Sequence, residues 1–354
     1  MTCILLSGAT GFVGGATARR LLEDDRVDRL VLLARSSDNL KGRDRLLQSI
    51  SRFGPVPERW RRVEVITGDL TTVALDRAVV DAVTHVIHAA ACTSLRSVKR
   101  VRESNVAGTA AIADQLEEAP RLRRFLFVST AYRCGITDAR VVNEDTPAAP
   151  EHVAEYTRSK SRAEEDLLSR RSFPLLIARP SVVVGHSRLG VKPSASMFWY
   201  YRALAEAGVS PFAPDKRRDI VPVDHVADAL VFLTFSPSPR HRCYHVSAGA
   251  RSSVRWGDIE AGFASCGLAS TRRQSVDPST LATHPALEAI AASDRNFRAG
   301  VEACARFSGL PIEWFANERL VAEGMPPPPP FTDYLRRCIE SSSRSVLEQM
   351  RDDA

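Results

Sequence analysis

The chain has 354 residues, of which 44% are hydrophobic and 25% charged, with a formal net charge of +6. This length and composition are typical of a globular protein with one large core or two lobes. No apolar run reaches the roughly 18 residues that cross a bilayer, and the first predicted strand starts almost at Met1, which leaves no room for a signal peptide. We therefore expect a cytoplasmic protein without a transmembrane segment.

The pattern of charged residues argues against a nucleic-acid-binding protein, and the pattern of cysteines argues against a metal-binding protein. Basic residues occur in short clusters, such as 121–124, that are typical of solvated helix faces, so nucleic acid is not a predicted partner. The seven cysteines are scattered and include no CxxC pair. We therefore predict reduced thiols and no metal site.

Short runs rich in leucine and β-branched residues alternate with longer amphipathic stretches through the first half of the chain. This alternation predicts parallel strands joined by crossover helices. The predicted strands are residues 3–7, 29–34, 63–67, 85–89, 124–129 and 175–179. Together they indicate an α/β protein with a doubly wound parallel sheet, a Rossmann fold, whose ligand crevice lies beyond the carboxyl ends of the strands.

After about Gly185 the pattern changes to proline-containing loops and isolated helices, which predicts a smaller, mostly helical substrate lobe. We place the Rossmann domain at residues 1–184 and the lobe at 185–354, with residues 220–250 returning to the first domain. A predicted helix at 196–208 opens with aromatic residues that either pack in the core of the lobe or line an apolar substrate site. A last helix is predicted at 331–350.

A glycine-rich turn directly follows the first predicted strand and opens a helix. Its glycines recur at every third residue, which lets the backbone turn tightly and approach a pyrophosphate at the amino terminus of the helix. The predicted cofactor contacts in this turn are Gly8, Thr10, Gly11, Phe12, Val13 and Gly14.

The end of the second predicted strand distinguishes the two nicotinamide cofactors. Proteins that prefer NAD usually carry an acidic residue there, which binds the adenosine ribose, whereas this chain has Arg35. A guanidinium can pair with the 2′-phosphate of NADP, and Arg43 lies close enough in sequence to assist. NADPH is therefore the predicted cofactor, and NAD(H) is the alternative.

Tyr156 and Lys160 are four residues apart, so on a helix both project from the same face. A free phenol has a pKa near 10, and a neighbouring ammonium would stabilise the phenolate and lower that pKa. We expect Tyr156 to act as the general acid toward the oxygen that gains charge when hydride arrives.

The glycine spacing and the Tyr156 and Lys160 pair resemble the extended short-chain dehydrogenase/reductase superfamily. This resemblance implies that Lys160 also holds the nicotinamide ribose and that Thr130, with Ser129 as the fallback, holds the substrate oxygen. Asn105 resembles the asparagine that supports the catalytic lysine, although a polar residue at this position could also simply bend its helix.

The same resemblance implies further cofactor contacts at the ends of three other predicted strands. Asp69 and Leu70 match the turn that contacts adenine, small residues after the fourth strand match a run along the cofactor, and Pro180 lies in the stretch that meets the nicotinamide amide. The small residues are Ala89, Ala90 and Ala91.

The branch of the superfamily is indicated by two short stretches. Dehydratases of this fold carry an acid and base pair where this chain has Ala131 and Tyr132, so dehydration is not expected. The Pro-Val-Asp element at 222–224 resembles that of fatty acyl-CoA reductases and thioester reductase domains. The implied substrate is an acyl thioester on coenzyme A or on an acyl carrier protein, which is reduced to an aldehyde or an alcohol.

Other functions stay open at this point. The same residues could serve a ketone or alcohol dehydrogenase or a nucleotide-sugar epimerase acting on another small-molecule substrate. A protein that only senses the cofactor is a third hypothesis, although such proteins usually lack the tyrosine and lysine pair. A homodimer is compatible with the sequence, which does not define the acyl chain length.

Overall fold

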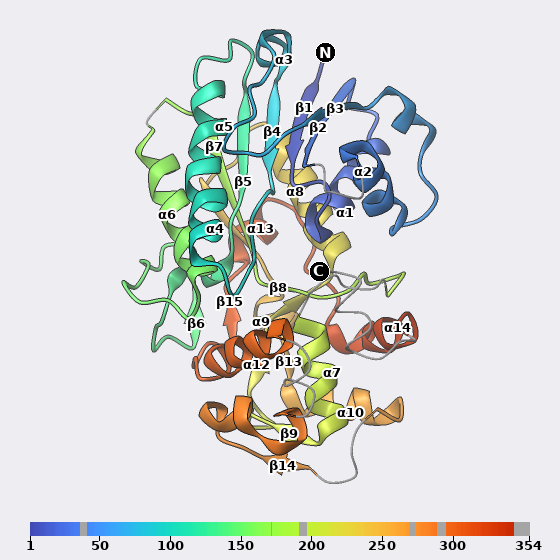
Figure 1. Ribbon diagram of the computed structural model, residues 1–354, viewed down its shortest axis with the longest axis vertical. Helices are drawn as coiled ribbons and strands as arrows, with labels where there is room; N and C mark the ends of the chain where they lie inside the picture. The colour runs from blue at the N-terminus through green and yellow to red at the C-terminus, as the bar shows by residue number, and fades with distance from the viewer. Residues whose placement is uncertain (36–40, 171, 191–196, 269–272, 289–294, 343–354) are drawn as a thin grey trace. The chain divides into compact units, whose positions relative to one another are not determined.

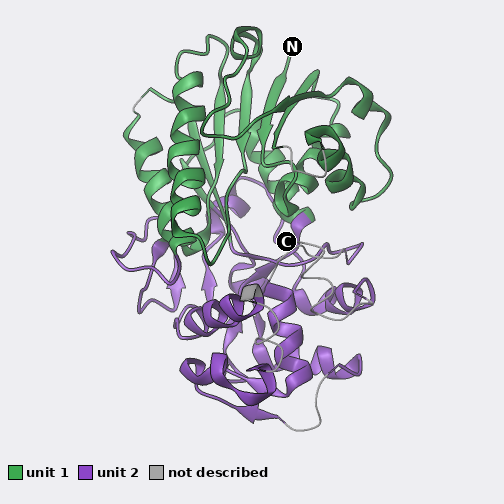
Figure 2. Ribbon diagram, in the orientation of Figure 1, with its two compact units in different colours: residues 1–133, 155–180, 224–244 green, residues 134–154, 181–223, 245–354 purple. Residues whose placement is uncertain are grey.

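The computed structural model describes all residues except 36–40, 171, 191–196, 269–272, 289–294 and 343–354. It divides into two compact units, which Figure 2 shows in separate colours. Unit 1 comprises residues 1–133, 155–180 and 224–244, and unit 2 comprises residues 134–154, 181–223 and 245–354. The chain thus passes between the units several times, whereas the sequence predicts one boundary at residue 184 and a single return.

A seven-stranded sheet with the order β12-β7-β5-β4-β1-β2-β3 forms the centre of unit 1 (Figure 1). Its strands are β1 (Cys3–Ser7), β2 (Arg29–Ala34), β3 (Glu64–Thr67), β4 (His85–His88), β5 (Arg124–Val128), β7 (Leu175–Pro180) and β12 (Cys243–Val246). The pairings from β7 through to β3 are all parallel. The predicted Rossmann fold is confirmed, and each of the six predicted strands is present within one or two residues, whereas β12 was not predicted as a strand.

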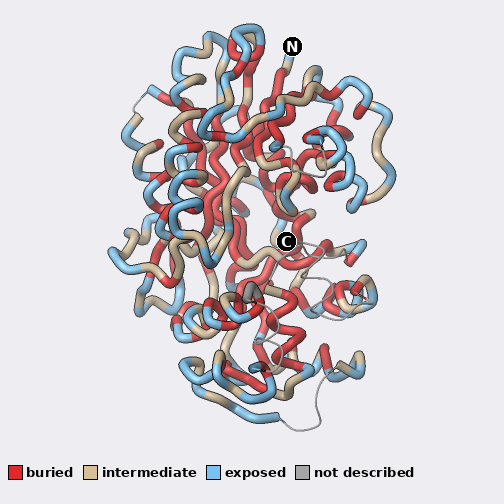
Figure 3. Tube along the Cα trace, viewed as in Figure 1, coloured by how far each residue is buried: buried red, intermediate tan, exposed pale blue. Residues whose placement is uncertain are grey.

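Helices lie on both sides of this sheet, so its strands are buried along almost their whole length, except for the partly exposed edge strand β3 (Figures 1 and 3). On one side, α3 (Arg77–Ala82), α5 (Gly108–Leu116) and α6 (Glu155–Ser169) contribute to a continuous apolar core. The remaining helices are α1 (Phe12–Leu22), α2 (Gly42–Ser51) and α8 (Val223–Phe235). This burial explains why the strands are near-continuous hydrophobic runs and could be predicted.

One long helix is interrupted by a π-helical turn. It starts as α4 (Val98–Arg102), continues through the turn η2 (Glu103–Ala107) and proceeds directly into α5. The turn is centred on Asn105, which is fully buried. Such turns often occur at functional sites.

Unit 2 combines helices with short, two-stranded pairings. The paired strands are β6 (Val141–Val142) with β15 (Trp314–Phe315), β8 (Val182–Val183) with β11 (Ile220–Val221), β9 (Val209–Ser210) with β14 (Gln274–Ser275), and β10 (Arg217–Arg218) with β13 (Val254–Arg255). Its helices are α7 (Met197–Ala207), α9 (Gly249–Ser252), α10 (Trp256–Ser265), α12 (Arg295–Ser308), α13 (Glu318–Ala322) and α14 (Leu335–Glu340). None of the helices in the described ranges is both long and apolar enough to cross a membrane.

The aromatic helix α7 lies in the core of unit 2. Phe198 and Trp199 are fully buried, and Phe198 packs against Phe263 at a ring distance of 6.0 Å. The structure therefore supports core packing for these residues. The predicted helix at 331–350 is a short helical turn at Phe331–Asp333 followed by α14, and the end of the predicted range lies outside the described residues.

A buried carboxylate joins three distant segments of unit 2. Asp219, between β10 and β11, accepts hydrogen bonds from the backbone N–H groups of Ala248 at 2.7 Å, Gly249 at 3.2 Å and Phe315 at 2.9 Å. Its burial raises the pKa of its carboxyl group. Because buried N–H groups without an acceptor destabilise a fold, Asp219 fixes how these segments pack.

We predict that Asp219→Ala lowers the free energy of unfolding by several kcal/mol, because three buried N–H groups each lose an acceptor at about 1–3 kcal/mol. Asp219→Asn keeps one acceptor oxygen and should lose less. Urea denaturation measures both losses. The exposed Asp215, four residues earlier, is the control: Asp215→Ala should leave stability unchanged. Equal stability of Asp219→Ala and the wild type would contradict this role.

Candidate active site

The carboxyl ends of the strands in unit 1 bring together most of the residues that the sequence singles out. Because the strands are parallel and ordered β7-β5-β4-β1-β2-β3, the segments that follow them lie in this same order along one edge. Thr130 follows β5, Ala89 follows β4, the glycine turn follows β1 and Arg35 follows β2. An extended ligand can therefore contact all of these segments in succession.

The glycine turn is held against the end of β4. Gly8 has a φ of +80°, and a Cβ there would lie 2.5 Å from the backbone nitrogen of Ala90. A Cβ on Gly14 would overlap the carbonyl oxygen of Gly8. Gly11 is the N-cap residue of α1 and provides no side-chain cap, so the first N–H groups of this helix have no partner within the helix. The turn thus has the tight backbone and the open helix start that a pyrophosphate site needs, and pyrophosphate binding by Gly8, Gly11 and Gly14 stays a prediction.

The remaining residues of the turn are partly exposed and lie at the start of α1. Thr10 and Val13 are partly exposed, and the ring of Phe12 lies 6.0 Å from that of Phe53. The small residues Ala89, Ala90 and Ala91 are also partly exposed at the end of β4. Their short side chains leave the backbone accessible on this edge.

The histidine that ends β4 is part of a buried hydrogen-bond network. His88 Nδ1 lies 2.9 Å from Ser7 Oγ, and its Nε2 lies 3.0 Å from Thr109 Oγ1. Burial and the nearby Lys160 lower the pKa of His88 to about 3, so the ring is neutral. This network connects the end of β1 to α5, behind the glycine turn.

The end of β2 carries two guanidinium groups. Arg35 lies 3.6 Å from Asp69, and Arg45 on α2 donates a hydrogen bond of 2.7 Å to the carbonyl oxygen of Arg35. Burial and the charge of Arg35 lower the pKa of Arg45. Bonds from Thr71 and the charge of Arg35 lower the pKa of Asp69. Leu70, in contrast, turns its side chain into the core of the unit.

Arg43 does not assist Arg35 as the sequence suggests. Its guanidinium donates to the carbonyl oxygens of Val63 at 3.1 Å and Trp60 at 3.3 Å, and it lies 4.8 Å from the centre of the Trp60 ring. The prediction was wrong because positions 43 and 45 project from different faces of α2. Sequence proximity to Arg35 could not decide which of the two arginines approaches it.

Lys160 is buried to 99% in the middle of α6, and its Nζ makes no hydrogen bond within the described part of the chain. The nitrogen lies 4.3 Å from the centre of the Phe127 ring on β5. Burial lowers the pKa of Lys160 to about 7, while the charge of Glu164 raises it. A buried ammonium without a hydrogen-bond acceptor is costly, so this site fits a ligand that supplies one, such as a ribose hydroxyl.

Tyr156 lies one turn before Lys160, as the spacing predicts, but its pKa shifts in the opposite direction from our expectation. Burial raises the pKa of Tyr156 to about 12. The expectation considered only the charge of the neighbouring ammonium, whereas removal of the phenol from water is what shifts the pKa here. The hydroxyl group is therefore held in its protonated form at neutral pH, which is the form that donates a proton.

Two hydroxyl groups follow β5. Thr130 Oγ1 accepts a hydrogen bond of 3.3 Å from the backbone nitrogen of Tyr132, which leaves its own proton to donate. Ser129 Oγ is buried and makes no hydrogen bond within the described residues. Both hydroxyl groups thus keep hydrogen-bonding capacity at this strand end.

Asn105 uses its side chain to join two segments. Its Nδ2 donates to the Cys92 carbonyl oxygen at 3.0 Å and to Ser159 Oγ at 2.9 Å, while its Oδ1 accepts from the Cys92 nitrogen at 2.6 Å. The amide therefore links the segment after β4 to the residue immediately before Lys160. The backbone carbonyl oxygen of Asn105 accepts a hydrogen bond of 2.8 Å from Thr109 Oγ1. The π-helical turn and the link are compatible with both interpretations of the sequence, a bent helix and support for the lysine.

Pro180 is the buried last residue of β7, whereas the side chain of the preceding Arg179 turns away from the strand end toward Glu164. Sequence reasoning missed this pair, and it also missed Ser159 and Arg45. The four-residue spacing of Lys160 and Glu164 could have signalled a shared helix face. No local pattern could have signalled the other three.

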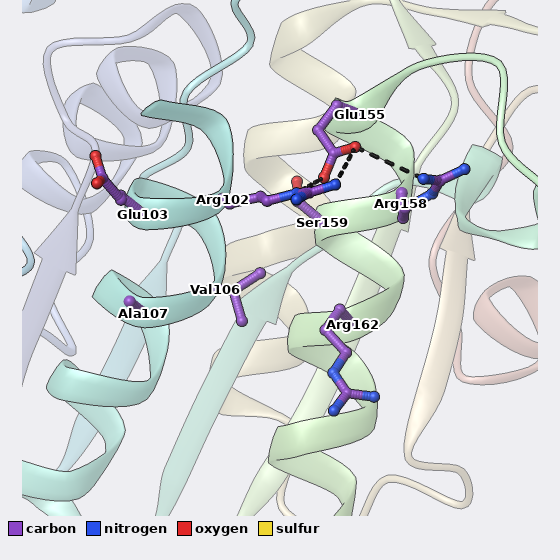
Figure 4. Close-up of a pocket in the computed structure, with 8 residues that line it drawn as sticks. All are labelled: Arg102, Glu103, Val106, Ala107, Glu155, Arg158, Ser159 and Arg162. Carbon is purple, nitrogen blue, oxygen red and sulfur yellow. Dashed lines mark hydrogen bonds and ion pairs between the residues drawn. The ribbon is translucent and has the colours of Figure 1, made fainter. Parts of the chain in front are cut away.

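A separate groove on the outer surface of unit 1 does not contain the predicted catalytic residues. It is lined by residues of α4, η2 and α6, namely Arg102, Glu103, Val106, Ala107, Glu155, Arg158, Ser159 and Arg162 (Figure 4). Arg102 donates a hydrogen bond of 2.6 Å to Glu155 within it. Neither Tyr156 nor Lys160 lines this groove.

Comparisons with known proteins define the class of this chain. The family described as "Male sterility protein" matches residues 6–230, and the chain belongs to this family. It is a member of the extended short-chain dehydrogenase/reductase superfamily, in the thioester reductase branch. Proteins of this superfamily use a nicotinamide dinucleotide, so this is the cofactor class that the strand-end residues fit.

Two curated relatives are similar over about 70% of this chain. The chain is 27% identical over 269 residues to the non-canonical nonribosomal peptide synthetase FrzA of Cladobotryum sp, of which the alignment covers 26%. It is 27% identical over 265 residues, or 69% of this chain, to the aldehyde reductase lnaA of Aspergillus flavus, of which the alignment covers 25%. The chain thus spans about a quarter of the length of these relatives.

Solved structures share the fold. The terminal R domain from the myxalamid PKS-NRPS biosynthetic pathway has a TM-score of 0.81 and 23% identity, with 97% of this chain and 90% of that chain covered. The dTDP-glucose 4,6-dehydratase of Bacillus anthracis in complex with NAD has a TM-score of 0.70 and 15% identity, with 100% of both chains covered. At these identities the likeness concerns the fold.

We predict that Lys160→Met stabilises the protein, because it keeps the apolar stem and removes the buried ammonium. The pKa of Lys160 is about 7 in the folded state and 10.5 as its ordinary value. Stability of the wild type therefore rises between these two pH values, where the unfolded chain binds the proton that the folded chain does not. The gain from the substitution should be largest at and below about pH 7 and should shrink toward pH 10.5.

Thermal unfolding across this pH range measures the effect. The control is Lys99→Met, since Lys99 is 86% exposed and pairs with Glu103. This control should change stability little at any pH. A Lys160→Met variant that is less stable than the wild type at neutral pH would show that the ammonium has a stabilising partner.

Proposed function

We propose that this protein is an NADPH-dependent reductase that converts an acyl thioester to an aldehyde or an alcohol, with Tyr156 as the general acid. The observation that carries the proposal is the buried Lys160 nitrogen, which makes no hydrogen bond within the described residues and lies one turn from Tyr156. A structural lysine would normally reach solvent or a partner. Its burial here is explained by a ligand that accepts its hydrogen bond.

Each residue of the site has a proposed role. NADPH, when bound, supplies the hydride for the substrate carbonyl. Lys160 binds a ribose hydroxyl, and the glycine turn with the first N–H groups of α1 binds the pyrophosphate. Thr130 donates a hydrogen bond to the substrate oxygen and so stabilises the negative charge that develops on it. Tyr156 then gives its proton to that oxygen.

Asn105 acts through other residues. Its amide fixes the segment that follows β4 and, through Ser159, the turn of α6 that carries Lys160. It therefore positions the site and does not itself need to touch the substrate.

The preference for NADPH rests on Arg35 and Arg45. Arg45 donates to the carbonyl oxygen of Arg35, and the charge of Arg35 contributes to the lowered pKa of Arg45. Like charges at close range are unfavourable, so an anion between them would stabilise both. The 2′-phosphate of NADPH is such an anion, and guanidinium groups can bind it through paired hydrogen bonds.

The thioester substrate is supported by the family and by the names of the relatives, which include peptide synthetases, aldehyde reductases and the R domain of a PKS-NRPS pathway. We infer that the acyl group is carried on coenzyme A or on a carrier protein. Hydride addition to the thioester carbonyl carbon would give an oxyanion, which Tyr156 would protonate to a hemithioacetal. Collapse of the hemithioacetal would break the carbon–sulfur bond, and the hydroxyl proton would pass to the sulfur, so that an aldehyde and a thiol are released.

The first test compares substrates and removes the proposed acid. Wild-type protein should oxidise NADPH with an acyl-CoA or a carrier-bound thioester, and more slowly with a ketone. Tyr156→Phe should lower kcat about 10²- to 10⁴-fold, the usual contribution of a general acid. Its affinity for NADPH, measured by fluorescence, should stay within about twofold, because the hydroxyl group has no proposed role in cofactor binding. Full activity of Tyr156→Phe would exclude Tyr156 as the acid.

The second test concerns cofactor preference. Arg45→Ala should weaken NADPH binding about tenfold or more, the effect of losing a charged hydrogen bond, and should change NADH binding little. Arg43→Ala is the matched control on the same helix, since its guanidinium is bound to Trp60 and Val63. It should leave the ratio of the two affinities unchanged. If both variants weakened NADPH and NADH equally, the phosphate site would lie elsewhere.

A further inference from the structure

A buried group of charges lies directly behind Lys160. Glu164, one turn further along α6, is fully buried. Arg179 on β7 donates to both of its carboxylate oxygens, with Nε at 3.0 and 3.2 Å and Nη2 at 2.7 Å. Arg133, on the short helix Ala131–Cys134, places its Nε 3.5 Å from the same carboxylate. Such paired contacts are typical of a carboxyl group that binds a guanidinium.

The other groups that face Lys160 do not carry a negative charge. The neutral ring of His88 approaches it from β4, and the ring of Phe127 approaches it from β5. On η2, the amide of Asn105 is bound to Cys92 and Ser159. On α6 itself, Tyr156 is held as a neutral phenol. Within the described residues, Glu164 is the charged group that raises the pKa of Lys160.

We propose that Glu164 is a positioning residue that keeps Lys160 in its ammonium form, and that Arg179 fixes the Glu164 carboxylate where it does so. The consequence for catalysis rests on the function proposed above, in which Lys160 binds the cofactor ribose. Glu164 itself acts through Lys160 and contacts neither substrate nor cofactor.

The two neighbouring guanidinium groups explain why Glu164 determines whether Lys160 is protonated. Arg179 and Arg133 lie beside the carboxylate and Lys160 lies one helical turn away from Glu164, and the two guanidinium groups cannot lose a proton in a protein. If the carboxylate is removed, the group that can relieve the unbalanced positive charge is therefore Lys160. Its pKa should fall by about one or more, as expected for the loss of a nearby opposite charge.

A direct measurement is available because the chain has only five lysines, at positions 41, 99, 160, 192 and 216. Labelling the lysine side chains with ¹⁵N gives one titrating NMR signal for each, and the signal of Lys160 is assigned by its loss in Lys160→Met. Glu164→Gln should move the midpoint of this titration down by about one pH unit or more. Glu165→Gln is the matched control, since Glu165 is half exposed and pairs with Arg162 on the surface.

A double variant separates this role from a purely structural one. Glu164→Gln alone leaves Arg179 buried without its partner, which can prevent folding. Glu164→Gln with Arg179→Gln removes both charges of the pair and should fold more stably. Because the double variant also loses the positive charge of Arg179, it is compared with Arg179→Gln, from which it differs only at position 164. Without the carboxylate, Lys160 should titrate about one pH unit lower in the double variant than in Arg179→Gln. Equal Lys160 midpoints in these two variants would overturn the proposal.

The activity profile gives the functional readout. In Glu164→Gln, kcat/KM with NADPH should fall at pH 7 by about fivefold if the Lys160 midpoint moves from about 7 to about 6, and it should recover as the pH is lowered. A loss that is the same at every pH would mean that Glu164 only shapes the fold. If wild-type protein did not use NADPH at all, the proposed function would fail, whereas the NMR titration would still test the effect of Glu164 on Lys160.

Discussion

The buried ammonium of Lys160 is the constraint on which the rest of the site depends. Placing this group in a largely apolar interior is unfavourable, and the structure offers it only the face of the Phe127 ring and the charge of Glu164 one turn away, within the part of the chain that is described. The helix α6 must therefore be held in a fixed place relative to the sheet. Asn105, through Ser159, and Arg179, through Glu164, hold it from two sides.

The order of the strands places the segments that follow them side by side along one edge of the sheet, where an extended dinucleotide could contact them in succession. Because β1 lies in the middle, between β4 and β2, the glycine turn separates a half with catalytic hydroxyl groups from a half with guanidinium groups. The first half ends at Thr130 and α6, and the second ends at Arg35, Arg45 and Asp69. The same fold thus fixes both ends of the proposed site, the end at which we propose that the reaction takes place and the end at which we propose that the two cofactors are distinguished.

Two revisions of the sequence-based expectations come from the tertiary surroundings of a residue, namely burial for Tyr156 and the face of α2 that carries Arg43. Tyr156 was expected to become more acidic beside an ammonium, yet removal of its hydroxyl from water raises its pKa to about 12. Arg43 was expected at the cofactor phosphate, yet its guanidinium covers Trp60 and binds two backbone carbonyl oxygens. In both cases the sequence singled out a residue with a suitable side chain, but it did not show which groups surround that side chain in the folded protein.

The sequence by itself determined the Rossmann sheet, the glycine turn and the spacing of Tyr156 and Lys160, because each depends on local periodicity or on residues a few positions apart. Only the tertiary structure decided that β12 joins the sheet, that Arg45 rather than Arg43 approaches Arg35, and that Asp219 joins three segments of unit 2. It also paired Glu164 with Arg179, 15 residues away on another element. These contacts depend on which faces of distant elements pack together, and one sequence does not contain that information in any local pattern.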